Sequence, residues 1–303
     1  MLIVDLHCDS LSTVTSEQGL INEYNFSKRK PQLQLTAAFV PKRNESPEQR
    51  RRRTMRFMDI YVAECARLSL VGVTGCHDLA FAEAVEKRAA MFTLEGGGGL
   101  FADSEELSNL YRMGLRVMGL AWDGNELSAS AYDEDDYGLT SEGRDMIDRL
   151  SELGIIIDVS HMSDKALYET LKATAYPLLA THSNLREICN TRRNLPTEAA
   201  QRIASRSGVI GLNIYPKLIN GTDDCDMDDI YRHVDLFLDK TGEDCLALGL
   251  DIDGTSGIYP SCFSTSRSIH DQLIERLAAR YGERITEKIA GENATLFFKN
   301  NLL

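Results

Sequence analysis

Short apolar segments alternate with segments of helical pattern along most of the chain, and this alternation constrains the fold more than any other feature. Strands are predicted at residues 2–9, 33–40, 91–95, 115–122, 155–161, 177–182, 208–215 and 245–251. Helices are predicted at residues 47–71, 103–113, 140–153, 163–173, 196–206, 226–240 and 266–280, with a closing helix over 286–303. Several strand segments are continuously apolar, which is typical of parallel strands buried on both faces. The pattern predicts an α/β fold of the TIM type, a (β/α)8 barrel in one domain over residues 1–303.

Composition and charge argue against several classes of partner. The 303 residues carry a formal net charge of -13, whereas nucleic acids and anionic membranes attract basic surfaces. No segment approaches the roughly 20 apolar residues that span a bilayer, and the first residues do not resemble a signal peptide. The seven cysteines include no CxxC pair, which favours reduced thiols. We therefore expect a cytoplasmic protein without a nucleic-acid or membrane partner.

Residues that can bind a metal ion or transfer a proton lie at the ends of most predicted strands. In a (β/α)8 barrel, these ends and the loops that follow them form the active site. These residues are His7, Asp9, Glu95, Asp123, His161, His182, Asp251 and Asp253, and Trp122 precedes Asp123 at the end of the fourth strand. Three of the six histidines fall in this set, which indicates a functional cluster.

Each of these residues also has a structural interpretation when it is taken alone. A single histidine such as His161 more often caps a helix or forms a hydrogen bond in the core. The four glycines after Glu95 could form a phosphate-binding loop, but neither a Walker lysine nor GxGxxG spacing accompanies them. His77, His233 and His270 lie in polar or helical segments and are predicted to be surface or structural residues.

Five of the strand-end residues together suit a pair of divalent cations. These candidate ligands, too many for one tetrahedral zinc ion, are His7, Asp9, Glu95, His161 and His182. Glu95 is the natural bridge because its carboxylate offers one oxygen to each ion. Two ions about 3.5–4 Å apart can hold a hydroxide between them and polarise a substrate carbonyl. Asp251 would then take a proton from the attacking water and return it to the leaving amine.

Seven short segments follow one another along the chain: DLHCD at 5–9, LEGG at 94–97, DVSHMS at 158–163, THSN at 181–184, RRNLP at 192–196, GLDIDG at 249–254 and GENA at 291–294. Together they resemble the signatures of the membrane dipeptidase (renal dipeptidase) family, a branch of the amidohydrolase superfamily. The resemblance extends from residue 2 to about residue 298 and is weakest over 41–90, where no motif is recognised.

The resemblance implies a zinc-dependent dipeptidase with two zinc ions per chain. Its substrate would be a dipeptide, with a D-residue or an unusual C-terminal residue as one option. His7 and Asp9 would hold the first ion and His161 and His182 the second, with Glu95 between them. The family analogy also implies a soluble bacterial-type enzyme that forms a homodimer.

The resemblance further implies that Arg193 binds the C-terminal carboxylate of the dipeptide. A guanidinium suits this role because it offers a planar, bidentate fork. From the residues alone, a surface ion pair is the more common explanation for such an arginine.

The chain departs from the family at the end of the fourth predicted strand. Relatives of the renal enzyme have a histidine there that stabilises the tetrahedral intermediate, and this chain has Trp122. An indole donates one hydrogen bond but cannot become a cation. Asp123 or Asn125 could compensate, and Trp122, Asn125 and Asp253 are predicted, with Arg193, to contact the substrate.

Two other functions stay open from the sequence. A related binuclear amidohydrolase would act on N-acyl amino acids, lactones or cyclic amides. A non-catalytic, metal-binding homologue is a further alternative, which the presence of all five ligands and Asp251 disfavours.

Overall fold

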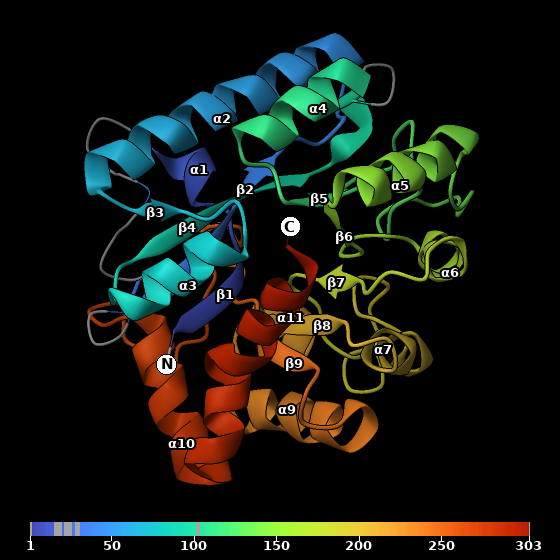
Figure 1. Ribbon diagram of the computed structural model, residues 1–303. Coiled ribbons are helices and arrows are strands. Elements are labelled where there is room, and N and C mark those ends of the chain that lie inside the picture. Colours follow the sequence, from blue (N-terminus) through green and yellow to red (C-terminus); the bar gives the residue numbers. More distant parts are fainter. Residues whose placement is uncertain (1, 15–19, 21–25, 28–30, 101–103, 303) are drawn as a thin grey trace.

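The barrel is formed by eight parallel strands in a closed ring, with helices around it (Figure 1). The computed structural model describes residues 2–14, 20, 26–27, 31–100 and 104–302. Around the ring, the strands are β1 (Ile3–Cys8), β2 (Gln32–Phe39), β4 (Ala89–Glu95), β5 (Val117–Gly119), β6 (Ile156–Asp158), β7 (Leu179–Ala180), β8 (Val209–Leu212) and β9 (Leu246–Leu248). β1 pairs with both β2 and β9, and β2 pairs with β4, so the ring has no open edge. The predicted TIM-type barrel is confirmed.

All eight predicted strands are present, but most end earlier than predicted. β7 contains only two residues of the predicted 177–182, and β6 ends at Asp158 rather than at residue 161. The apolar runs continue past the point where pairing stops, because the loops after the strands are themselves buried. Apolar character therefore predicts burial more accurately than it predicts strand length.

The predicted helices are α2 (Pro47–Leu68), α4 (Ser104–Met113), α5 (Ser141–Leu153), α6 (Asp164–Ala173), α7 (Thr197–Ala204), α9 (Met227–Thr241) and α10 (Ile269–Glu287). Local sequence explains where several of them begin. At the start of α2, for example, the Ser46 hydroxyl accepts a hydrogen bond from the Gln49 amide, and the Gln49 side chain accepts one from the Ser46 amide. Residue 103, where one helix was predicted to begin, lies outside the described residues.

Several short elements were not predicted. They are α1 (Ser10–Thr13), β3 (Val71–Gly72), α3 (Cys76–Ala84), the 3-10 helix η1 (Gly97–Leu100) and α8 (Pro216–Ile219). The predicted helix 47–71 ran into Val71, but α2 ends at Leu68 and β3 pairs with the first residues of β4, Ala89 and Ala90. α3 has a weak helical pattern because Phe81 is exposed, while Leu79 and Ala82 are buried.

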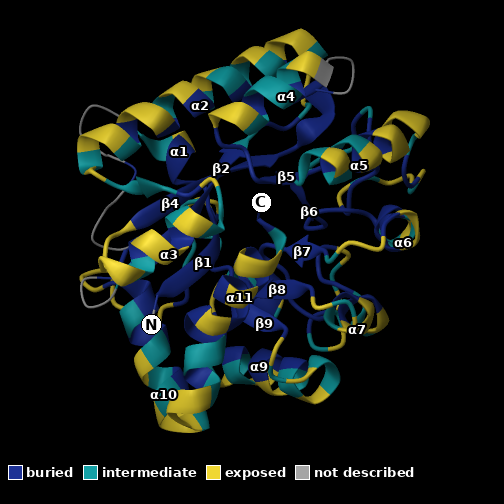
Figure 2. Cartoon of the chain, viewed as in Figure 1, coloured by how far each residue is buried: buried dark blue, intermediate teal, exposed yellow. Residues whose placement is uncertain are grey.

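The amino end of the barrel is closed by the last helix of the chain. The predicted segment 286–303 comprises the end of α10, a π-helical turn η2 (Lys288–Glu292) and α11 (Asn293–Asn301), and Leu303 lies outside the described residues. Phe297 and Phe298 of α11 join Leu2, Val4 and Leu33 in a separate apolar cluster at the strand starts. The strands and the inner face of α11 are correspondingly buried (Figure 2). The residues predicted to form the active site lie at the opposite end of the barrel, where the strands finish.

Two further expectations concern cysteines and membranes. The seven cysteines, all within the described residues, are not joined in disulfides in the structure. Within the part of the chain that the structure describes, no helix combines the length and the apolar composition needed to cross a membrane.

We predict that Phe298→Ala lowers the free energy of unfolding by about 3–5 kcal/mol, because the phenyl ring is fully buried in the barrel floor. Leu296→Ala is the matched control on the same helix, since Leu296 is 61% exposed and should change stability by less than about 0.5 kcal/mol. Urea denaturation of both variants measures the difference. Equal effects at the two positions would contradict the assignment of α11 as the floor.

Candidate metal centre

The five predicted ligands converge at the carboxyl end of the barrel. Glu95 is the last residue of β4, His7 is near the end of β1, and Asp9 follows that strand. His161 and His182 lie in the loops after β6 and β7. None of the five is more than 8% exposed. Side chains separated by up to 175 positions thus share one buried site.

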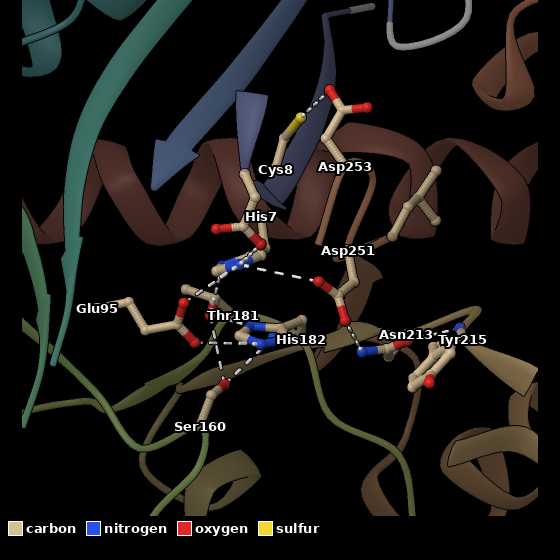
Figure 3. A network of polar contacts seen from close by, with 12 residues as sticks. His7, Cys8, Glu95, Ser160, Thr181, His182, Asn213, Tyr215, Asp251 and Asp253 are labelled. Atoms are coloured by element: carbon tan, nitrogen blue, oxygen red, sulfur yellow. Dashed lines mark hydrogen bonds and ion pairs between the residues drawn. The ribbon is translucent and has the colours of Figure 1, made fainter. Parts of the chain in front are cut away.

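Glu95 belongs to two groups of potential ligands. Figure 3 shows its carboxylate directed toward His7 and His182. On one side, the His7 Nε2 atom is 3.3 Å from Asp9 Oδ2 and 3.9 Å from Glu95 Oε2. On the other side, Glu95 Oε1 is 2.6 Å from His161 Nε2 and 3.7 Å from His182 Nε2. In each group, one ligand atom from every residue lies within 4.8 Å of the others. The two carboxylate oxygens therefore face different histidines.

The chemistry of these donor atoms fits divalent cations. Burial, followed by nearby positive charges, holds the pKa values of His161 and His182 well below their usual range, so both imidazoles are neutral. Their Nε2 atoms are only 2.9 Å apart, and Asp9 Oδ1 is buried without a hydrogen-bond partner among the described residues. Neutral imidazoles and carboxylates that converge in this way are the ligands expected of a zinc-type ion.

The charge balance of the site also favours cations. Burial disfavours a charged His7, but the hydrogen bond and charge of Asp9, with the charges of Glu95 and Asp251, raise its pKa to about 10. Burial also raises the pKa of Glu95 well above its usual range. The buried carboxylates thus need positive charge, and a divalent cation supplies it while leaving His7 neutral to bind.

Asp251 lies beside both groups. Its Oδ1 atom is 4.0 Å from His7 Nε2, and its Oδ2 atom accepts a hydrogen bond of 3.0 Å from Asn213 Nδ2. Burial is the main cause that raises the pKa of Asp251 to about 6. Because Asp251 also forms a candidate ligand group with His7 and His182, it is close enough to act on any molecule held there.

Three residues of the site have left-handed backbone conformations. The φ angles are 68° at His161, 61° at Asp251 and 67° at Asp253. This region is unfavourable for residues with a Cβ atom, although aspartate and histidine adopt it more readily than most. Such conformations persist where the surrounding structure holds them, and here they aim side chains into one cavity.

Arg193 is buried at the edge of the site rather than exposed in a surface ion pair. Its guanidinium donates to Ser183 Oγ at 3.1 Å and to the His182 carbonyl at 2.9 Å, and Nη2 is 3.0 Å from His161 Nε2. The residue is only 5% exposed. Its position is therefore fixed by the same loop that carries His182.

A cavity of about 390 Å³ opens above the ligands. Its apolar wall contains Phe39, Trp122, Tyr132 and Tyr215. The Trp122 ring lies 4.9 Å from Phe39 and 5.4 Å from Tyr132 between centroids, so these three rings pack as one wall. Trp122, Arg193, Asp251 and Asp253 all line the cavity, as a substrate-contacting role for them requires.

Asn125, which was predicted to contact the substrate, is not among the residues that line the cavity. Its amide donates to the Leu120 carbonyl at 2.8 Å and accepts from the Leu127 amide at 2.8 Å, so it organises the loop after β5. Asp123 has a similar role, because its carboxylate accepts hydrogen bonds from the backbone amides of Lys42 and Arg43. Neither side chain lines the cavity beside Trp122.

Several residues at or beside the cavity were not predicted from the sequence. Asn213 follows β8 and orients Asp251, so the rule of polar residues at strand ends could have found it. Phe39 also ends a strand, but an aromatic residue at that point gives no chemical signal. Tyr132 lies in a long loop without a pattern. His233 and His270 are buried structural residues and His77 is exposed, as predicted.

Comparison with known proteins identifies the family. A model of the membrane dipeptidase family, peptidase family M19, matches residues 1–300. The chain belongs to this family. The resemblance read from the sequence and the predicted enzyme class, a metallo-dipeptidase, are confirmed, and a metal cofactor is implied.

Two related proteins show the extent of the sequence similarity. An uncharacterised protein from the pqqA 5' region of Klebsiella pneumoniae is 31% identical over 218 residues, which is 68% of this chain and 80% of that protein. Dipeptidase tcpJ of Claviceps purpurea is 31% identical over 172 residues, 55% of this chain but only 40% of that relative.

The fold is shared with solved structures. A metallopeptidase from Rhodobacter sphaeroides, solved with a phosphinate mimic of the dipeptide L-Ala-D-Ala, aligns with a TM-score of 0.86. The alignment covers 100% of this chain and 99% of that chain at 19% sequence identity. At that identity, the likeness establishes the barrel architecture alone.

Proposed function

We propose that this member of the family is a zinc-dependent dipeptidase that uses two zinc ions per chain. His7, Asp9 and Glu95 would hold one ion, and Glu95, His161 and His182 the other. The observation that carries the proposal is the position of the Glu95 carboxylate, whose two oxygens face separate histidine groups. When bound, such paired ions lower the pKa of water and polarise the carbonyl of the scissile amide.

Asp251 would be the general base and acid of the reaction. Its Oδ2 atom is held by Asn213, and its Oδ1 atom points toward His7, so the carboxylate faces the region between the ligand groups. A pKa raised to about 6 keeps the carboxylate ionised near neutral pH but makes its conjugate acid a competent proton donor. Asp251 can therefore accept a proton from water and deliver it to the leaving amine.

Arg193 would bind the C-terminal carboxylate of the substrate. Its guanidinium is buried at the cavity wall and is braced by Ser183 and the His182 carbonyl, so little side-chain freedom is lost on binding. Burial raises the pKa of Tyr132, and the charge of the nearby Arg193 guanidinium opposes this rise. The tyrosine hydroxyl and the guanidinium are therefore close to each other. A substrate carboxylate at this place would meet a cation and a hydroxyl together.

The cavity suits a small peptide. A volume of about 390 Å³ lies at the lower end of the range for small-molecule sites. The Phe39, Trp122 and Tyr132 wall offers apolar surface to a substrate side chain instead of the polar histidine of the renal enzyme. The phosphinate mimic of L-Ala-D-Ala bound by the Rhodobacter sphaeroides neighbour supports a dipeptide with a D-residue at its C-terminal end.

We predict that Asp251→Asn reduces kcat on dipeptides by about 100- to 10,000-fold, because the amide cannot accept and return the proton. The matched control is Asp148→Asn on the exposed surface of α5, which should retain wild-type kcat. Steady-state kinetics and metal analysis should be done on the same preparations, since the metal content of Asp251→Asn should not change. Full turnover by that variant would remove Asp251 from the mechanism.

We also predict that Arg193→Ala raises KM by about 10- to 100-fold for a dipeptide with a free carboxylate, as expected for a lost hydrogen bond to a charged group. The C-terminal amide of the same dipeptide should show a much smaller change, because it offers no charge to the guanidinium. Arg193→Lys should restore only part of the affinity, since an ammonium cannot bind bidentately. Equal effects on the two substrates would favour the alternative in which a cyclic amide or lactone is hydrolysed.

A further inference from the structure

The hydroxyl of Thr181 lies on the Nδ1 side of His182, whereas the Nε2 atom of that ring faces Glu95, and Thr181 is not among the residues that line the cavity. Thr181 directly follows β7 and is only 1% exposed. Its Oγ1 atom is 2.6 Å from Asp158 Oδ2, 2.8 Å from His182 Nδ1 and 3.5 Å from His7 Nδ1 (Figure 3). One hydroxyl thus connects a buried carboxylate with the far side of a candidate ligand.

The direction of these hydrogen bonds follows from the partners of Asp158. Its Oδ1 atom already accepts hydrogen bonds from the backbone amides of Ser160 and Thr181, each at 2.9 Å. A carboxylate that accepts in this way also accepts from the Thr181 hydroxyl, which therefore donates its single hydrogen to Asp158. Thr181 Oγ1 also lies 3.3 Å from Ser160 Oγ, which is farther away than Asp158 Oδ2.

The tautomer of His182 follows in turn. Because Thr181 Oγ1 has donated its hydrogen, it can only accept from His182 Nδ1, and that nitrogen must carry the proton. A neutral imidazole protonated at Nδ1 leaves the lone pair of Nε2 free. The Nε2 atom is the one that faces Glu95 Oε1 and His161.

The backbone around Thr181 is held closely, which keeps this geometry in place. A Cβ atom on Gly211 would lie 2.0 Å from the Thr181 carbonyl oxygen, and one on Gly249 would lie 1.9 Å from it. Glycines at these positions let β8 and the chain after β9 pack directly against residue 181.

His161, the other imidazole of this ligand group, is not held in the way that His182 is. Its Nδ1 atom has no hydrogen-bond partner among the described residues.

We propose that Thr181, held by Asp158, is a positioning residue that fixes the tautomer and orientation of His182 for metal binding. This inference rests on the proposed two-ion function and deepens it, since it assigns a role to a residue that touches neither ion nor substrate. Partners of this kind, which orient a ligand from behind, typically change metal affinity by about 10- to 100-fold when they are removed.

The test compares Thr181→Val, which keeps the shape of the side chain without its hydroxyl, with Thr181→Ser, which keeps the hydroxyl. Zinc affinity is measured on the full chain by competition with a chromophoric chelator. Thr181→Val should bind the weaker of its two ions about 10- to 100-fold less tightly than the wild type, and Thr181→Ser should stay within about threefold. Equal affinities of Thr181→Val and the wild type would overturn the proposal, as would equal losses in both variants.

A second measurement is independent of the variants. In the wild-type protein without added metal, NMR correlations of the labelled imidazoles should show His182 protonated at Nδ1. Protonation at Nε2 instead would overturn the inference even if Thr181→Val fails to fold. A wild type that holds two zinc ions while Thr181→Val binds equally well would refute only the role of Thr181. A wild type that binds no zinc would refute the proposed function as well.

Discussion

The site depends on a buried carboxylate, that of Glu95, placed between two groups of imidazole nitrogens. Asp9, which is buried, and Asp251, which is partly exposed, bring two more acidic groups within reach of His7. Buried anions are costly unless positive charge or hydrogen bonds compensate them. Burial accordingly raises the pKa of Glu95, and the acidic groups hold the pKa of His7 far above its usual value. An arrangement of this kind stabilises cations, and the rest of the barrel end is organised to maintain it.

The two ends of the barrel have different roles: the amino end contributes to stability, and the carboxyl end carries the candidate metal ligands. α11 and the apolar cluster around Phe298 close the amino end of the barrel, while the loops at the carboxyl end carry the polar groups. Many of these groups are held from behind: Asp251 by Asn213, Arg193 by Ser183, and His182 by Thr181. Strand pairing stops early at β6 and β7, so the loops that follow are held in place by side-chain hydrogen bonds.

Much of this could be predicted from the sequence, for a physical reason. Parallel strands in a barrel end at the same rim, so polar residues at the ends of apolar runs must meet, as His7, Glu95 and His182 do. Positions in the loops follow no such rule. Asn125 was predicted to contact the substrate as a polar residue close to Trp122, but the loop folds its amide onto the backbone. β3 and α3 were missed because a two-residue strand and a short helix with an exposed phenylalanine leave almost no periodic signal.

The central claim is that Glu95 is shared by two metal ions, and anomalous diffraction from crystals of the full chain grown with zinc tests it most directly. The account predicts two peaks, one on each side of the Glu95 carboxylate, with His7 and Asp9 at the first and His161 and His182 at the second. A single peak, or zinc bound away from Glu95 at full occupancy, would contradict it.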